Sequence, residues 1–421
     1  MNNFIKNPYE IKREIVNFSK KISENCTKPT SKFVLDMQYG LAKSGSCLIS
    51  NIARALDEDI KLSYTIERLC DNLSNMYKED KKTIWDNYLN EVKNNIKEKD
   101  NVALFDDSDI NKEYSKKLED LDRVIDASSQ DKKIVNGYHK CEATVLTKNE
   151  KQPISVYSKI YSCKSADFKS MNAYTLESIK AVEEVCGKDF TGIFDRGFDD
   201  NKIYDYMSKN GHNFVIRLDD ERQLLFKGKR RSVGEVSKTR KGKIKMITLF
   251  DNNDEKELMI SYTKAILPYN KKEYTLVIVY GLSEDKPMKL LTNLEYAEKE
   301  EVIKIVRLYL SRWRIEEYFR GKKQEYDLEN MRVRTLESMN NLNMMLTIHL
   351  GHLAILADKV NKNLLITKII YASKSLKSKA IVWLSQIARG IKKILSYAHK
   401  GIKEWQGITS QEKYKQLTLR L

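Results

Sequence analysis

Four polar side chains lie at helical spacing in the segment "YLSRWRIEEYFRGKK", residues 309–323. On a helix that turns about 100° per residue, Tyr309, Arg312, Glu316 and Lys323 fall within an arc of about 60°. Such groups usually form i,i+4 pairs on a solvated helix face. Together they also suit phosphodiester chemistry, since the guanidinium and the ammonium can contact phosphates and the tyrosine can donate to a phosphate or stack on a base.

Two carboxylates follow predicted strands far upstream of this stripe. Asp106 ends the strand in "NVALFDD", and Asp195 ends the strand in "FTGIFD". If the two strands are neighbours, their carboxyl ends meet at one edge of the sheet, where ligands of such sheets bind. With Glu316 they would supply three hard oxygen ligands for Mg²⁺. Two such ions, about 3.5–4 Å apart, would activate the attacking oxygen and stabilise the leaving oxygen of a phosphodiester. A strand-end aspartate taken alone more often caps a turn or a helix.

The composition favours a polyanionic partner. The chain has 75 basic and 59 acidic residues, a net charge of +16 and a pI near 9.2. This balance favours nucleic acid over a membrane surface as the partner.

Six cysteines without a CxxC pair predict reduced, mostly buried thiols in a cytoplasmic protein. The five histidines show no zinc spacing, and His349 and His352 are expected to be structural. The start has no signal-peptide core, and the apolar run "MMLTIHLGHLAILA" is too short to span a bilayer.

The order of the predicted elements indicates the fold that positions the acids. Three strand patterns are followed by a helix, a strand, a second helix and a further strand. An antiparallel meander continued by parallel strand–helix units is the order of a ribonuclease-H-like α/β fold with a mixed sheet. The predicted elements are strands at 101–107, 139–147 and 154–162, a helix at 172–187, a strand at 190–195, a helix at 200–211 and a strand at 212–218.

A chain of 421 residues is expected to form more than one domain. The N-terminal region is predicted to be helical and DNA-binding, with two short helices around "DEDIKL" that fit either a helix-turn-helix or a plain bundle. A β-rich basic insertion, whose segment 222–245 reads as a flexible hairpin, interrupts the core. The predicted regions are 1–97 (helical, DNA-binding), 98–221 (catalytic core, first part), 222–295 (insertion), 296–345 (core helix with the third acid) and 346–421 (basic, helical).

The spacing Tyr309-x2-Arg312-x3-Glu316-x6-Lys323 resembles the Y-R-E-K signature of bacterial insertion-sequence DDE transposases of insertion-sequence family four. "FDRG" and an Asp-x-Ser strand end lie upstream in the matching order, and the resemblance covers about residues 100–345. It implies that Asp106, Asp195 and Glu316 are the catalytic metal ligands, with Asp107 and Asp109 as fallbacks for the first. It also implies that Tyr309, Arg312 and Lys323 contact the DNA backbone near the cleaved end.

The same resemblance implies a reaction and its setting. Two Mg²⁺ ions, for which Mn²⁺ can substitute, would support nicking that frees a 3′-hydroxyl, which then attacks target DNA. The protein would act as a homodimer on double-stranded DNA, bridging two transposon ends, in the bacterial cytoplasm at the nucleoid. Members of the family that form a DNA hairpin stabilise a flipped base on a tryptophan of the insertion. Residues 222–295 contain no Trp, so either Tyr262, Tyr269 or Tyr274 substitutes or the hairpin is not used.

Two alternative functions fit much of the same sequence. One is a catalytically inactive, transposase-derived DNA-binding protein, against which the three intact acids argue. The other is a structure-specific nuclease with the same ribonuclease-H-like fold, which would use water as its only nucleophile and never join DNA to a target. A basic amphipathic segment at 359–403 would also suit an anionic membrane surface.

Overall fold

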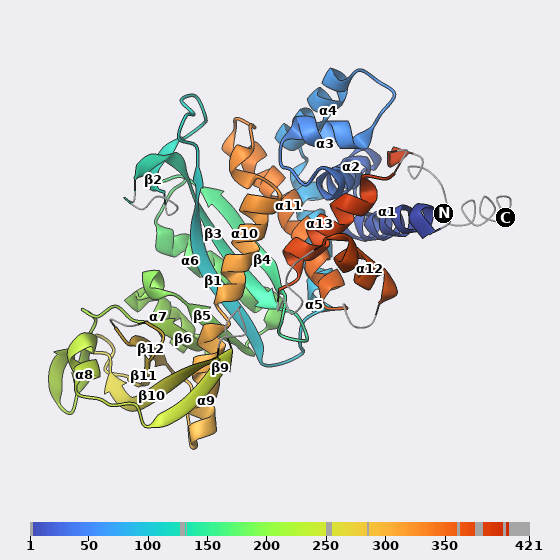
Figure 1. Ribbon diagram of the computed structural model, residues 1–421. Helices are drawn as coiled ribbons and strands as arrows, with labels where there is room; N and C mark the ends of the chain where they lie inside the picture. Colours follow the sequence, from blue (N-terminus) through green and yellow to red (C-terminus); the bar gives the residue numbers. More distant parts are fainter. Residues whose placement is uncertain are drawn as a thin grey trace.

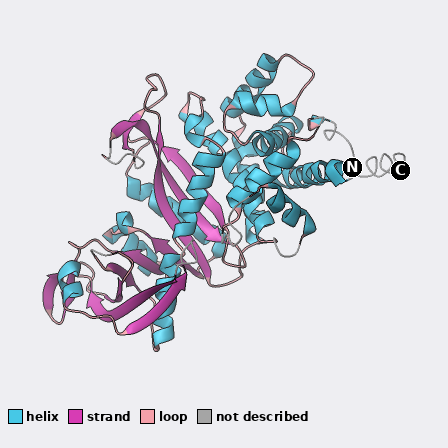
Figure 2. Ribbon diagram, viewed as in Figure 1, coloured by secondary structure: helices cyan, strands magenta, loops and turns pink. Residues whose placement is uncertain are grey.

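A twelve-stranded sheet runs through the centre of the molecule in the computed structural model, with helices from both ends of the chain gathered on one side (Figure 1). Strands and helices alternate in the middle of the chain, whereas the outer parts are helical (Figure 2). The residues that the structure describes are 3–126, 131, 133–249, 255–283, 286–359, 363–374, 382–398 and 401–403.

Five strands form a ribonuclease-H-like core in the order β4–β3–β1–β5–β6. β3 is antiparallel to both β1 and β4, whereas β1, β5 and β6 are parallel. This topology confirms the predicted fold class and the predicted neighbourhood of the two strands that carry Asp106 and Asp195. The bounds are β1 Asn101–Asn111, β3 Ile134–Leu146, β4 Pro153–Tyr161, β5 Phe190–Phe194 and β6 Asn213–Arg217.

Helices cover both faces of this core, as buried parallel strands require. α6 (Met171–Cys186) packs on β1, β3 and β4, and α10 (Trp313–Arg320) packs on β1 and β4 from the other face. α6 begins where the side chain of Ser170 accepts a hydrogen bond from the backbone N–H of Ala173. It ends at Gly187, which has a positive φ of 66°, so the predicted stop is confirmed. The next helix along the chain is α7 (Asn201–Lys209).

A short strand that the sequence pattern did not indicate pairs with the edge of β3. β2 (Asp122–Ile125) is antiparallel to the first residues of β3, and β4 pairs with the remainder of that strand. With four residues, two of them charged, β2 shows too little alternation to be predicted from sequence.

The insertion continues the core sheet. β12 pairs antiparallel with β6, and β11 and β10 extend the sheet beyond it. β7 and β8 form the predicted hairpin, turning at Lys227 and Gly228, which both have positive φ. The segment 222–245 differs from a simple hairpin because Ser232 and Glu235 form a capping box that starts α8. The bounds are β7 Gln223–Phe226, β8 Lys229–Ser232, α8 Val233–Lys238, β9 Ile244–Leu249, β10 Glu255–Ile266, β11 Glu273–Tyr280 and β12 Met288–Thr292.

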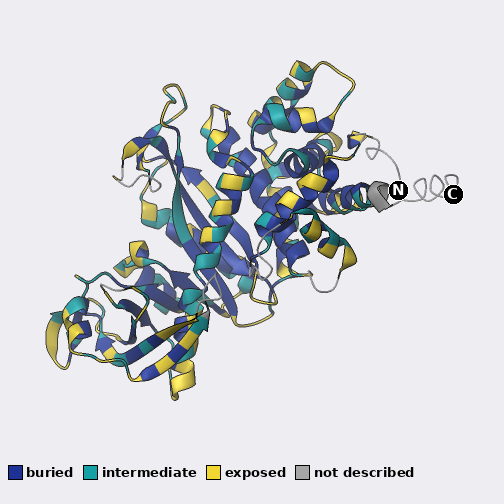
Figure 3. Cartoon of the chain, in the orientation of Figure 1, coloured by how far each residue is buried: buried dark blue, intermediate teal, exposed yellow. Residues whose placement is uncertain are grey.

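Helices from the two ends of the chain share one core. α11, which contains the apolar run, is buried along most of its length and contacts α2, α4 and α13 as well as β4. Buried positions concentrate on the sheet and on the inner helices (Figure 3). The two helices expected around "DEDIKL" are α3 and α4. The bounds are α1 Asn3–Ile22, α2 Lys28–Ser44, α3 Ile49–Leu56, α4 Leu62–Ser74, α5 Lys78–Lys93, α11 Leu336–Ala357, α12 Leu364–Ala372 and α13 Leu384–Leu395.

Several smaller predictions can be compared with this part of the fold. His349 is buried between the hydroxyl of Tyr326 and the side chain of Gln38, a structural role as predicted. All six cysteines are free, but only Cys47 and Cys141 are buried, so the prediction of mostly buried thiols is wrong. No helix among the described residues is long and apolar enough to cross a membrane. Parts of the predicted basic region, residues 360–362, 375–381, 399–400 and 404–421, lie outside the described residues.

Candidate active site

Asp106 and Asp195 occupy equivalent positions on neighbouring parallel strands. The register pairs Phe105 of β1 with Phe194 of β5, and each aspartate is the residue that follows, with Asp195 directly after the end of β5. The prediction that Asp106 ends its strand is wrong, because β1 continues to Asn111 in its pairing with β3. Neighbouring strands lie about 4.8 Å apart, and in-register residues of parallel strands point to the same face. Both carboxylates therefore emerge together on the face that α10 covers.

The helical segment that carries the third acid is interrupted. α9 (Lys299–Leu310) ends just before Ser311, and α10 begins at Trp313. The backbone N–H of Arg312 donates to the carbonyl of Tyr309, three residues back, so the chain tightens at this turn. Tyr309 therefore lies at the end of one helix and Glu316 in the first turn of the next. The expectation of one continuous helix is wrong here.

Arg312 joins two of the three acids. One guanidinium nitrogen, Nη1, lies 3.0 Å from Oδ2 of Asp106, and the other, Nη2, lies 2.5 Å from Oε1 of Glu316. The guanidinium is largely buried, with 14% of its side chain exposed, whereas half of the Glu316 side chain is exposed. The carboxylate of Asp106, in the middle of β1, and that of Glu316, 210 positions later on α10, thus meet at a single side chain.

The remaining acid, Asp195, is contacted by Tyr309 at the end of α9. The hydroxyl of Tyr309 donates to Oδ1 of Asp195 at 2.8 Å. Arg217, at the end of β6, places Nη1 3.6 Å from the same oxygen. Arg217 was not identified from sequence, although its position at the carboxyl end of a parallel strand next to β5 was a usable signal.

Electrostatics distinguish the two aspartates. Burial raises the pKa of Asp106 to about 7, with smaller contributions from nearby carboxylates, including Asp195 and Glu316, while Arg312 opposes the rise. Burial would also raise the pKa of Asp195, but Arg312, a backbone N–H, Tyr309 and Arg217 together hold it below its usual value. The charged form of Asp106 is therefore less stable than that of Asp195, and a bound cation would favour it.

The two fallback residues for the first acid lie on the opposite face of the sheet. Because side chains alternate along a strand, Asp107 and Asp109 point away from Asp106. Asp107 hydrogen-bonds with the thiol of Cys141, and Asp109 lies 3.1 Å from the ring of His139. Neither can join Glu316, so the geometry favours Asp106.

Lys323 does not lie with the other members of the stripe. Its ammonium is 3.1 Å from Oε1 of Glu329. A π-helical turn at Gly321–Glu325 follows α10, and its wider turn rotates later residues away from the direction that 100° per residue predicts. Its neighbour Lys322 points inward and is fully buried. Of the four residues, the structure gathers Tyr309, Arg312 and Glu316 around the aspartates.

The three acids suit a hard divalent cation by the chemistry of their oxygen donors and by the raised pKa of Asp106. The carboxylate oxygens of Asp106, Asp195 and Glu316, all described residues, do not all lie within 4.8 Å of one another. The guanidinium of Arg312 lies between Asp106 and Glu316, so a cation at these acids would compete with it for the same oxygens.

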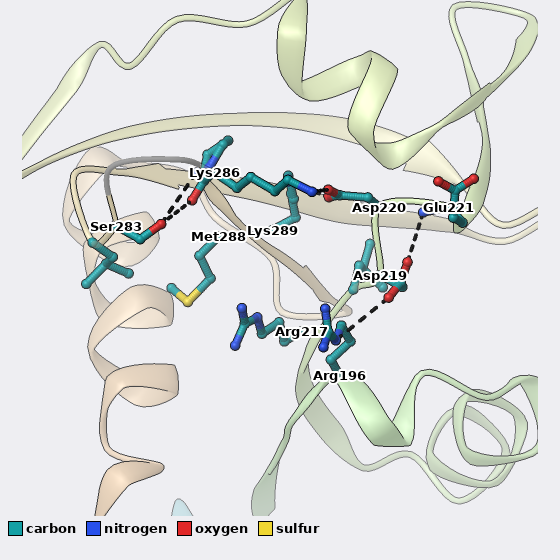
Figure 4. A pocket seen from close by; sticks show the side chains of 12 residues that line it. Arg196, Arg217, Asp219, Asp220, Glu221, Ser283, Lys286, Met288 and Lys289 are labelled. Atoms are coloured by element: carbon teal, nitrogen blue, oxygen red, sulfur yellow. Dashed lines mark hydrogen bonds and ion pairs between the residues drawn. The ribbon is translucent and has the colours of Figure 1, made fainter. Parts of the chain in front are cut away.

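A pocket of about 370 Å³, lined in part by Arg196 and Arg217, opens between the end of the core sheet and the insertion. Arg196 and Arg217 lie on one side of it, and Lys289, paired with Asp220, lies on the other (Figure 4). Arg217 belongs to both the pocket and the surroundings of Asp195. A ligand in this pocket would therefore contact Arg217, whose guanidinium also lies near Asp195.

Comparison with known proteins gives one family. A family model described as a transposase DDE domain matches residues 97–350, more than half of the chain, from β1 through most of α11. A cryo-EM structure of a piggyBac transposase synaptic complex with hairpin DNA is similar with a TM-score of 0.47 and 13% identity, over 98% of this chain and 82% of that one. No curated protein sequence matches. The match spans Asp106, Asp195 and Glu316, and the chain belongs to the transposase DDE domain family.

Proposed function

We propose that this transposase performs cut-and-paste transposition of a bacterial insertion sequence of insertion-sequence family four, acting in the cytoplasm at the nucleoid. Asp106, Asp195 and Glu316 would hold two Mg²⁺ ions, or Mn²⁺ in their place. The observation that carries this proposal is the convergence of carboxylates from β1, β5 and α10 around Arg312. Bound ions would supply activation of the attacking oxygen and stabilisation of the leaving oxygen.

The chain's own side chains have distinct roles in this proposal. Tyr309 orients Asp195 by donating to Oδ1. Arg312 pairs with both Asp106 and Glu316, and its planar guanidinium can bind a phosphate in two-point contact. Lys323 would contact DNA only from the periphery, since Glu329 holds it.

We propose that DNA contacts spread over the predicted regions. The helical region 1–97 and the basic insertion 222–295 would bind transposon ends, 98–221 and 296–345 would form the catalytic core, and 346–421 would serve dimerisation or DNA contact. Exposed Lys229 and Arg230 on β8 support a role for the insertion.

The structure also bears on which tyrosine could stack on a flipped base. Tyr274 is buried and Tyr262 packs edge-on against Tyr296, whereas Tyr269 is exposed and hydrogen-bonds with Asp205. Of the three, Tyr269 is therefore the tyrosine that we propose for stacking on a flipped base, because it is exposed.

The test is incubation of the protein with a supercoiled plasmid that carries the inverted repeats flanking its gene. A transposase releases the element and joins its 3′-ends to target DNA, and both products require Mg²⁺ or Mn²⁺. Cleavage without joining would identify the nuclease alternative. Binding to the repeats without any metal-dependent cleavage would identify the inactive DNA-binding alternative.

A further inference from the structure

Three potential metal ligands from separate segments meet on the face of the sheet opposite Arg312. A carboxylate oxygen of Asp122, a ring nitrogen of His139 and the sulfur of Cys163 all lie within 4.8 Å of one another. Among the residues that the structure describes, no other three His, Cys, Asp or Glu side chains approach one another this closely. None of them takes part in the proposed transposition site.

The strand arrangement explains why they meet. β2 and β4 pair with the same edge of β3, one after the other. Asp122 of β2 pairs with Gly137, and Tyr161 of β4 pairs with His139. The pairing partner of β3 therefore changes from β2 to β4 between Gly137 and His139. Cys163 follows two residues after Tyr161, and its backbone N–H donates to Oδ2 of Asp122 at 2.8 Å.

The imidazole ring of His139 is held in one orientation. Its Nδ1 lies 3.1 Å from Oδ1 of Asp109, the residue opposite it on β1, and its ring stacks on Tyr161. Its other nitrogen, Nε2, faces Oδ2 of Asp122 at 4.0 Å. A carboxylate that accepts the Nδ1–H leaves the lone pair of Nε2 free to bind a metal, an arrangement common behind metal-ligating histidines.

We propose that Asp122, His139 and Cys163 bind a divalent transition-metal ion of the Zn²⁺ class, with Asp109 orienting the histidine. Imidazole, thiolate and carboxylate together suit Zn²⁺ or Co²⁺ and not Mg²⁺, which prefers oxygen ligands. Cys163 is exposed, so solvent can supply the fourth ligand. The bound ion would fasten the ends of β2 and β4 to β3.

The test is a titration of the full-length protein, after removal of metals by a chelator, with Co²⁺ alone. A tetrahedral site with a cysteine gives visible d–d bands and a near-ultraviolet thiolate-to-cobalt charge-transfer band, which Zn²⁺ then displaces. The acids around Arg312 offer no sulfur, so Co²⁺ bound there cannot produce the charge-transfer band. Cys163→Ser should abolish that band, whereas the control Cys70→Ser, at a half-buried thiol on α4, should retain it.

A further variant tests the orienting role of Asp109. Asp109→Asn should keep the charge-transfer band but weaken Co²⁺ binding by about 10–100-fold. The proposal is overturned if saturating Co²⁺ gives no charge-transfer band in the wild-type protein, or if the band survives Cys163→Ser. Unchanged Co²⁺ affinity in Asp109→Asn would contradict the role of Asp109 in orienting His139.

Discussion

At the scale of single residues, the site is a balance between buried carboxylates and one guanidinium. Asp106 has its pKa raised to about 7, chiefly by burial, although Arg312 contacts it directly. A folded-state pKa above the unfolded value means that ionisation of this group opposes folding. In metal-free protein, the free energy of unfolding should therefore fall as the pH rises from about 4 to about 7 through this residue.

Asp106→Asn should remove that fall. The stability of the variant relative to wild type should be about 3 kcal/mol greater at pH 8 than at pH 5, because about two pH units separate pH 5 from the pKa of Asp106 and each corresponds to about 1.4 kcal/mol. Urea unfolding in the presence of a chelator measures this difference. Asp71→Asn, at an exposed position of α4, is the control, and its free energy of unfolding should change with pH as that of wild type does. The raised pKa would be contradicted if the free energy of unfolding of Asp106→Asn followed the same pH dependence as wild type.

Arg312→Ala should weaken binding of transposon-end DNA and lower the slope of log affinity against log salt by about 1, as expected for one lost phosphate contact. Fluorescence anisotropy over a range of salt concentrations measures both. Arg320→Ala is a matched control on the same helix, since Arg320 is exposed and pairs with Glu317. An unchanged slope for Arg312→Ala would show that the guanidinium serves the acids alone.

At the scale of elements, a buried ion cluster anchors the end of α10. Lys322, in the π-helical turn, donates to both oxygens of Glu142 at 3.1 Å and to Thr347 of α11 at 2.8 Å. Lys140 also pairs with Glu142. Burial would raise the pKa of Glu142, but the two ammonium groups hold it well below its usual range. The cluster ties the helix of Glu316 to β3 and α11.

Lys322→Met should therefore lower the free energy of unfolding by about 2–4 kcal/mol, because it leaves a buried carboxylate short of a partner. Its neighbour provides the control: Lys323→Met removes a surface pair and should cost less than about 1 kcal/mol. Urea unfolding at neutral pH compares the two. Equal losses would mean that the buried cluster does not anchor the helix.

The sequence predicted the site better where strands carry it than where helices do. Asp106 and Asp195 could be placed together because a buried strand pattern and parallel order determine which positions of neighbouring strands lie side by side. The break at Ser311 and the π-helical turn depend on packing and on buried partners such as Glu142, which helical periodicity does not contain. The group of Asp122, His139 and Cys163 depends on an unpredicted strand, β2, and on the position along β3 at which its pairing partner changes from β2 to β4.

At the scale of the whole molecule, the insertion and the terminal helices are parts of one structure. The insertion extends the core sheet through β12, and α11 packs between the N-terminal helices and β4. A DNA end bound by the insertion would thus be held at a fixed position relative to the acids.

Joint replacement of Lys229, Arg230 and Arg231 by alanine should weaken binding of transposon ends and lower the salt slope by about 2. The control, Lys180→Ala with Lys188→Ala, removes exposed charges on and just after α6, on the face away from α10. Anisotropy over the same salt range compares the two. An equal loss in both variants would indicate an effect of net charge alone.

The most direct test of the central claim is cleavage of a transposon end by single-acid variants under conditions where end binding is measured in parallel. Asp106→Asn, Asp195→Asn and Glu316→Gln should each abolish Mg²⁺-dependent cleavage and leave end binding largely intact. Asp109→Asn and Glu317→Gln should still cleave, because their carboxylates lie outside the group around Arg312. A shared catalytic role for the three acids would be contradicted if Glu316→Gln cleaved at the wild-type rate. It would also be contradicted if the single-acid variants lost end binding together with cleavage.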